Sequence, residues 1–135
     1  MLIFAIISSL AGCSILPGAH DLSGVYVYDG MFPITVIRFQ TDGSFEARCD
    51  YYEYSTGAIY YGSYSKSGDV YNIRFEGAET SSGNAVTNFK DETFGYEFEM
   101  SAKVLDEDRI AIWVSGGNSY YPWMNSRPVF TAGYW

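Results

Sequence analysis

The residue types that perform most enzyme chemistry are scarce in this chain of 135 residues. His20 is the only histidine, and Cys13 and Cys49 are the only cysteines. A Ser-His-Asp or Cys-His site would need that one histidine to reach a folded pocket, and a histidine-based zinc site lacks ligands. We therefore expect no enzymatic activity, no metal site and no cofactor, and we interpret His20 as a residue of a solvated linker.

Carboxylates are the most numerous groups that could do chemistry, and Asp106-Glu107-Asp108 is a dense run of them. Calcium loops place oxygen ligands at alternate positions and usually contain a glycine for the bend. This run lacks the glycine, and Arg109 follows it directly, which is unfavourable for a bound cation. A hydrolase with paired acids would place them across a cleft, and no pattern here predicts that spacing. We expect a solvated hairpin turn at 106–108.

Aromatic side chains are better candidates for binding, since they make up 19% of the chain. Rings in loops present flat apolar faces with a polar tip, which suit sugar rings, peptides or a partner protein. Tyr120, Tyr121 and Trp123 form such a run in an expected loop. We take these three as candidate partner-binding residues. The alternative is that they pack over an end or an edge of the fold.

The first ten residues, Met-Leu-Ile-Phe-Ala-Ile-Ile-Ser-Ser-Leu, are an uncharged apolar run. A membrane-spanning helix needs roughly 20 apolar residues, whereas the apolar part of a signal peptide is of this length. Leu10-Ala11-Gly12-Cys13 closes the run and resembles the lipobox of bacterial lipoproteins. The alternative is a buried amino-terminal strand in which Cys13 is a core residue.

The lipobox resemblance implies that residues 1–12 are a lipoprotein signal peptide and that Cys13 carries a diacylglycerol on its thiol. Residues 13–22 would then be a lipidated tether, and residues 23–135 a single domain. The protein would lie in the cell envelope, anchored to a membrane by lipid. That membrane would be the outer membrane in a Gram-negative cell, where Ser14 permits export, or the cell surface in a Gram-positive cell.

The charge and the remaining cysteine limit the partners further. The formal net charge of −8 opposes binding to nucleic acid, which requires a basic face. If Cys13 is lipidated, Cys49 has no partner for a disulfide within the mature chain. Cys49 shares a strand face with Phe45 and Ala47, so we expect a buried, inert thiol. An intermolecular bond or a reactive thiol is the alternative.

Strands are the elements that must position these residues. Short alternating segments recur between turn signals, and they predict strands at 24–28, 34–40, 44–49, 58–66, 70–76, 93–105, 109–115 and 128–134. Asp42-Gly43 and Ser67-Gly68-Asp69 are typical of tight hairpin turns. The stretch 77–88 is polar and shows no apolar period.

The alternation divides several of these segments into two faces. Tyr71, Ile73 and Phe75 share a face, and so do Ile110, Ile112 and Val114. Phe94, Tyr96, Phe98 and Met100 form a third set. We expect these sets to line one core and the charged residues between them to meet water. About eight antiparallel strands joined by short turns favour closure into a β-barrel, which hides their edges.

Three segments resemble bacterial lipocalin-like domains, which show G-x-W/Y, F-x-x-D-G-x-F and G-x-Y-x-x-x-G-D in this order. They are Gly24-Val25-Tyr26, Phe39-Gln40-Thr41-Asp42-Gly43-Ser44-Phe45 and Gly62-Ser63-Tyr64-Ser65-Lys66-Ser67-Gly68-Asp69-Val70-Tyr71. Tyr26 replaces the usual tryptophan, and residues 77–135 have no such match. The resemblance implies an all-β fold, a small antiparallel meander β-barrel that is lipocalin-like.

A lipocalin-like barrel is expected to bind a small apolar ligand inside. The inward rings Tyr71, Phe75, Tyr96 and Phe98 would then line the cavity. The alternative is that these rings fill a small barrel completely. The protein would in that case be an envelope interaction or structural subunit without a ligand cavity, with another envelope protein as its partner.

Overall fold

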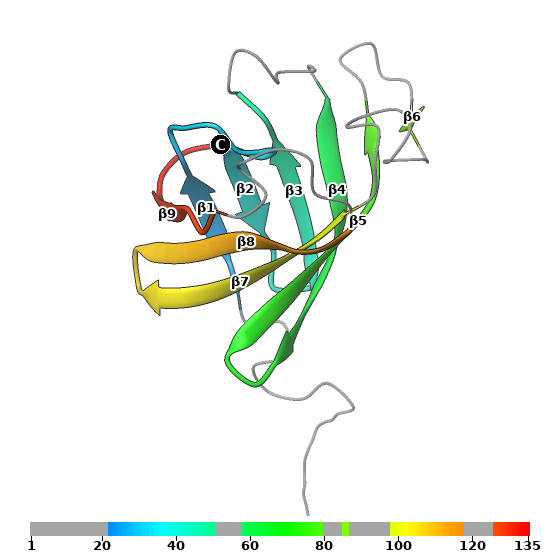
Figure 1. Ribbon diagram of the computed structural model, residues 1–135. Helices are drawn as coiled ribbons and strands as arrows, with labels where there is room; N and C mark the ends of the chain where they lie inside the picture. Colours follow the sequence, from blue (N-terminus) through cyan, green and yellow to red (C-terminus); the bar gives the residue numbers. More distant parts are fainter. Residues whose placement is uncertain (1–21, 51–57, 80–84, 87–97, 118–125) are drawn as a thin grey trace, which may run out of the picture.

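The computed structural model describes residues 22–50, 58–79, 85–86, 98–117 and 126–135 (Figure 1). All the regular elements within these ranges are β-strands. They are β1 (Gly24–Val27), β2 (Val36–Phe39), β3 (Ser44–Arg48), β4 (Ile59–Ser67), β5 (Val70–Glu79), β6 (Ala85–Val86), β7 (Phe98–Asp106), β8 (Arg109–Gly117) and β9 (Val129–Ala132).

The strands form a closed antiparallel barrel. Their order is β4-β3-β2-β1-β9-β8-β7-β5, and β4 also pairs with β5, which joins the two edges. Each barrel strand therefore lies beside its neighbours in sequence, and β1 lies beside β9. The short β6 pairs outside this ring with the end of β5. The prediction of an all-β meander barrel of about eight strands is confirmed, and a lipocalin-like barrel is consistent with this topology.

The predicted division into two faces is confirmed where the strands are described. On β5, Tyr71 and Ile73 are buried, Phe75 is partly buried, and the residues between them are exposed. On β8, Ile110 and Ile112 are buried and Val114 packs against the core. Cys49 is buried, as expected from its position two residues after Ala47.

Several predicted strand ends are wrong. β5 continues to Glu79, although the sequence from residue 77 was expected to be a polar loop. Gly77 and Ala78 are buried and pair with Tyr61 and Tyr60 of β4, so small side chains extend the ladder where no large apolar residue signals it. The strand β6 also lies within the stretch expected to lack strands. β7 is described only from Phe98, and residues 93–97 of the predicted strand lie outside the described residues.

The two ends of the barrel differ. At one of them, which we call the turn end, the chain reverses in the tight β2–β3, β4–β5 and β7–β8 turns, and Leu22 leads into β1. At the other, which we call the connection end, β1, β3, β5 and β8 end and β2, β4, β7 and β9 begin. Figure 1 shows the β4–β5 turn at the bottom and the β1–β2 connection at the top.

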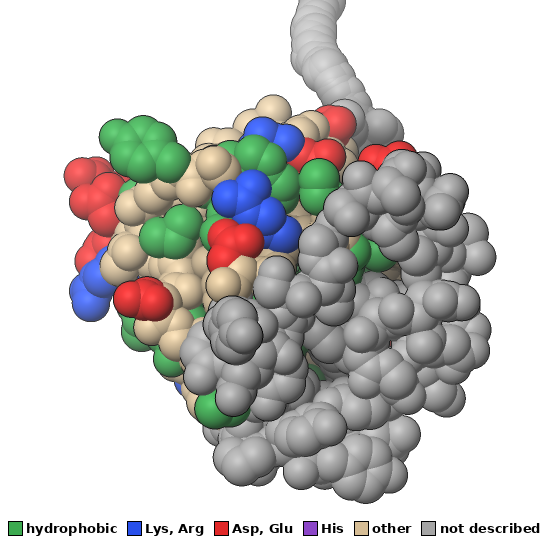
Figure 2. Space-filling model, turned by 90° about the horizontal axis from the view of Figure 1, so that it is seen from above, with side chains coloured by type: hydrophobic (Ala, Val, Ile, Leu, Met, Phe, Trp, Pro, Cys, Tyr) green, Lys and Arg blue, Asp and Glu red, His purple; other side chains and the backbone are tan. Residues whose placement is uncertain are grey.

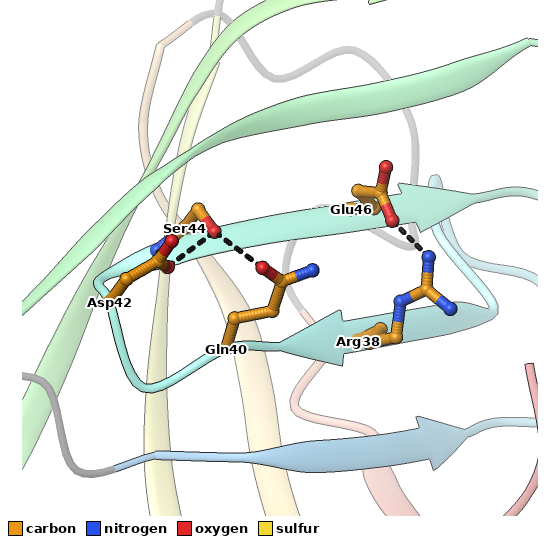
Figure 3. Close-up of polar contacts among 5 residues, drawn as sticks. All are labelled: Arg38, Gln40, Asp42, Ser44 and Glu46. Atoms are coloured by element: carbon orange, nitrogen blue, oxygen red, sulfur yellow. Dashed lines mark hydrogen bonds and ion pairs between the residues drawn. The ribbon is translucent and has the colours of Figure 1, made fainter.

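Glycine and aspartate shape the turn end, as the sequence indicates. Gly43 and Gly68 have positive φ angles of 92° and 68°, which favour glycine. In the β2–β3 turn, Asp42 Oδ1 accepts hydrogen bonds from the backbone N–H of Ser44 at 2.9 Å and from Ser44 Oγ at 2.6 Å (Figure 3). Ser44 Oγ also lies 3.2 Å from Gln40 Oε1. These contacts hold the backbone in its turn.

The acidic run forms the β7–β8 turn and is exposed, as predicted. The backbone N–H of Asp108 donates to Asp106 Oδ1 at 2.9 Å, and Arg109 Nε donates to Asp106 Oδ2 at 2.7 Å. These hydrogen bonds, first the backbone one and then that of Arg109, lower the pKa of the Asp106 carboxyl. Arg109, which follows the acidic run, therefore forms an ion pair with Asp106, the first residue of the run.

A bulge brings the backbones of β4 and β5 unusually close at Gly62. The register shifts between Tyr61 and Gly62, and a Cβ atom built on Gly62 would lie 1.9 Å from the backbone oxygen of Arg74. It would also lie 2.9 Å from Cε1 of Phe45. Any other residue at this position must push β5 or the Phe45 ring away.

Replacing Gly62 by alanine tests this close approach. We expect Gly62→Ala to lower the free energy of unfolding by about 1–3 kcal/mol or more, because the added methyl group meets backbone rather than a movable side chain. The matched control is Gly116→Ala, where the nearest atom would be 3.8 Å away. Urea denaturation of both variants checks the prediction, and equal losses would contradict it.

Replacing Asp106 by asparagine tests the turn as a function of pH. The folded pKa of Asp106 lies below the unfolded value of 3.8, so its carboxylate stabilises the fold above that pH and loses this effect as the pH falls through the folded pKa. Asp106→Asn should therefore reduce the melting temperature at pH 7 and make progressively less difference below about pH 4. Glu107→Gln, a change in the neighbouring exposed residue, serves as control. A difference in melting temperature between Asp106→Asn and the wild type that grows as the pH falls would refute the prediction.

Candidate functional site

The structure places some of the residues singled out by the sequence and leaves others undescribed. Tyr71 and Phe75 lie on the inner face of β5. Phe98 is the first residue of β7. The remaining candidates, Tyr96, Tyr120, Tyr121, Trp123 and Cys13, lie outside the described residues.

The interior around Tyr71 and Phe75 is packed with other aromatic rings. The centroid of the Tyr71 ring lies 5.9 Å from that of Tyr64, whereas the Phe75 ring packs edge-on against Phe45 at 5.1 Å and Tyr60 at 6.5 Å. Such edge-to-face contacts are favourable for aromatic pairs. The two candidates thus share the inner face of β5 but contact different rings, and Phe39 joins the two groups because it contacts both Tyr64 and Phe45.

The same packing continues around the barrel. Phe39 contacts Tyr64 at 5.3 Å and Tyr26 at 6.2 Å between ring centroids, and Phe130 contacts Phe32 at 6.0 Å. An eight-stranded barrel has an interior that its own side chains can fill or that can hold one small ligand. Within the described residues, these rings share the buried core with aliphatic side chains such as Ile73, Met100 and Ile112.

Tyr64 closes the turn end. Its hydroxyl lies 2.6 Å from the backbone oxygen of Leu22 and 2.6 Å from that of Gln40, and the side chain is buried. The Tyr64 hydroxyl thus links Leu22, just before β1, to Gln40, just after β2. Sequence reasoning missed this role, although Tyr64 is the tyrosine of the Gly62-Ser63-Tyr64 motif and could have been recognised there.

Two concave regions lie on the outside of the barrel. The first, which we call the β4–β5–β7 groove, has a volume of about 500 Å³. Its lining includes Asp42, Ser63, Ser65, Asn72, Arg74 and Glu99. It lies where the β5–β7 ladder ends at the pair Ile73 and Met100, between the bulges at Tyr61/Gly62 and at Glu99/Met100. Bulges are frequent beside functional sites because they redirect side chains.

The second region, the Tyr134 pocket, has a volume of about 280 Å³ and lies outside β1, β2 and β3 near the connection end. Residues 133–135 reach it by folding over β1, where the backbone N–H of Gly133 donates to Val25 O at 3.0 Å. A Cβ atom on Gly133 would lie 2.8 Å from Val27 Cγ2, so glycine permits this close passage. The pocket is lined by Val27, Tyr28, Asp29, Gly30, Thr35, Val36, Arg48, Asp50 and Tyr134.

Trp135, beside this pocket, packs on two arginines. The guanidinium carbons of Arg38 and Arg48 lie 4.4 Å and 4.8 Å from its ring centroid. Arg38 also forms an ion pair with Glu46 (Figure 3), and Arg48 Nε lies 3.2 Å from Asp50 Oδ2. The result is an outer surface in which guanidinium groups, carboxylates and an aromatic ring are stacked together.

No group of three or more histidine, cysteine, aspartate or glutamate side chains in the described ranges is placed to hold a metal ion. No helix that is long and apolar enough to cross a membrane occurs in the same ranges.

Comparison with known proteins adds no relative: no protein-family model, curated protein or solved structure matches this chain. Its function is therefore inferred from its own residues.

Replacing Tyr64 by phenylalanine tests the closure of the turn end. Tyr64→Phe removes the donor between Leu22 O and Gln40 O, and we expect a loss of about 1–3 kcal/mol in the free energy of unfolding. Tyr134→Phe is the control, because that side chain is 93% exposed and its hydroxyl should contribute little. Chemical denaturation measures both, and a Tyr64→Phe variant as stable as wild type would contradict this role.

Proposed function

We propose that this protein is a lipid-anchored β-barrel of the cell envelope that binds another envelope protein through its outer surface. The observation that carries the proposal is the packing of the described inner rings, among which Tyr60, Tyr64, Phe39 and Phe45 are almost fully buried and contact one another or Phe75. Because the described interior is occupied by the protein's own rings, binding is favoured on the outside.

The polarity of the barrel supports an anchored arrangement. The tether would enter at the turn end, where Leu22 is fastened by Tyr64, and the long connections leave from the opposite end. From Cys13 to Leu22 the chain can span at most about 30 Å. A lipid on Cys13 would thus keep the barrel near the membrane with its connection end directed outward, where Tyr120, Tyr121 and Trp123 belong to the β8–β9 connection.

The charge of the turn end also suits a domain held by a tether rather than adsorbed on lipid. The exposed residues Asp42, Glu107 and Asp108 lie in or beside the tight turns, whereas Asp69, also exposed, pairs with Lys103 at 3.3 Å. Carboxylates are repelled by anionic headgroups. The anchor would therefore come from the lipid on Cys13 and not from the barrel surface.

A second candidate function is the transport or sensing of a small apolar ligand. Phe75 favours it, because this inward ring is only partly buried although its neighbours are fully buried. A ligand would then sit beside Phe75, together with the other candidate residues Tyr71, Tyr96 and Phe98.

Lipid attachment is tested in the bacterial host. We expect Cys13→Ser to remain uncleaved and to leave the membrane fraction, because the thiol that receives the diacylglycerol is gone. Cys49→Ser should stay membrane-bound, since Cys49 is a buried core thiol. Mass spectrometry of the wild-type amino-terminal peptide provides the decisive measurement, and an intact, unacylated Met1 terminus would refute the anchor.

The choice between an outer and an inner site is tested with an apolar fluorescent probe. A barrel filled by its own rings should show no saturable uptake of 1-aminoanthracene. Saturable binding with a negative heat-capacity change that is lost in Phe75→Ala would favour the ligand carrier. The wild-type and variant barrels are compared by titration calorimetry at two temperatures.

A further inference from the structure

The Tyr134 pocket contains a carboxylate without a counterion. Of its three charged groups, Arg48 and Asp50 are paired with each other, and Asp50 is further fixed because its backbone N–H donates to Thr35 Oγ1 at 2.6 Å. Asp29 makes no hydrogen bond or ion pair with any residue that the structure describes. The pocket therefore carries one uncompensated negative charge.

The pocket also contains an aromatic ring that the fold leaves unused. Tyr134 is 93% exposed, although its neighbour Trp135 is packed between strand side chains. Tyr28 also lines the pocket, but its ring packs against Phe130 and Phe32 of the core. A free ring and a free carboxylate thus face the same small space.

A carboxylate next to an aromatic face is an arrangement that attracts a cation, because the ring quadrupole and the negative charge act in the same direction. The protein already uses this contact one residue away, where Arg38 and Arg48 lie over Trp135 at 4.4 Å and 4.8 Å. A guanidinium group suits such a site better than an ammonium group, since it is planar, weakly hydrated and able to bind a carboxylate with two N–H groups.

The size of the pocket points to a single side chain. Sites for complete small molecules have volumes of roughly 300–1,000 Å³, and this pocket has about 280 Å³. The net charge of −8 favours a basic partner at longer range. Figure 2 shows basic side chains beside acidic and hydrophobic ones on the described surface. Because the charges on this surface are mixed, recognition of a partner would depend on specific charge pairs rather than on one uniform electrostatic potential.

We propose that the Tyr134 pocket binds an arginine side chain of a partner protein, with its guanidinium group between the Asp29 carboxylate and the Tyr134 ring. This inference rests on the proposed function, because it names the chemistry of the partner that the outer surface would recognise. Asp29 supplies the charge, Tyr134 supplies the stacking face, and the Arg48–Asp50 pair borders the site.

The test uses the full chain, with N-acetyl-arginine-methylamide as the probe, and binding is followed by amide chemical shifts in NMR. We expect saturable shifts that centre on Asp29, Gly30 and Tyr134 and weaken with added salt. The neutral isostere N-acetyl-citrulline-methylamide should bind at least about tenfold more weakly, as should arginine to Asp29→Asn. Tyr134→Ala should weaken binding about two- to fivefold.

Glu107→Gln is the matched control, because it removes one exposed carboxylate at the opposite end of the barrel and changes the net charge equally. Its affinity for the arginine probe should equal that of the wild type. The inference is overturned if Glu107→Gln weakens binding as much as Asp29→Asn, if citrulline binds as well as arginine, or if no saturable shift occurs. It is also overturned if N-acetylglucosamine, a neutral sugar, shifts the same amides while arginine does not.

The outcome is separable from the proposed function. Lipid attachment at Cys13 and the absence of apolar-probe uptake are measured without the arginine probe. If those results hold and arginine does not bind, this pocket is excluded as the recognition site while the envelope assignment stands.

Discussion

Closure of the sheet between β4 and β5 sets the space that every other part of the protein must fill or avoid. Once β4 pairs along its length with β5, the ring of eight strands has no free edge, and its interior has a fixed width. The inward residues must then match that width, and they do so with large rings in edge contact. Within the described residues, these rings contact one another across the interior of the barrel.

The same closure explains the need for a glycine at position 62 and a tyrosine at position 64 of β4. The bulge at Gly62 lets β5 approach so closely that only a hydrogen atom fits against Arg74 O. Two residues later, the ring of Tyr64 reaches across the interior and its hydroxyl meets the carbonyl oxygens of Leu22 and Gln40. Gly62 thus permits the close approach of β4 and β5, and Tyr64 fixes the turn end of the barrel through its hydrogen bonds.

Much of this fold could be predicted from one sequence because its causes are local. Alternation along 71–76 and 109–115 reports which side chains face the core, and Gly43 and Gly68 mark backbone turns that few other residues adopt. The extension of β5 through Gly77 and Ala78 could not be predicted, since small residues carry no alternating signal and their place is decided by Tyr60 and Tyr61 on β4.

The outer sites could not be predicted for a different reason. Asp29, Arg48 and Tyr134 come from three separate parts of the chain and meet only because β1 lies between β2 and β9. A single sequence does not report which strands adjoin or how residues 133–135 fold back. The lipobox, by contrast, is a local motif, and the anchor it implies stays a prediction of the sequence.

The entry of the chain at Leu22 also has a mechanical consequence. A force applied to the chain ahead of Leu22 acts along the axis of β1, which is hydrogen-bonded to β2 on one side and to β9 on the other. Antiparallel hydrogen bonds run perpendicular to their strands, so such a load shears both ladders at once instead of opening them one bond at a time. The Tyr64 hydroxyl holds the carbonyl of Leu22 and would bear the strain first. The barrel would thus resist tension that is applied through the chain before Leu22.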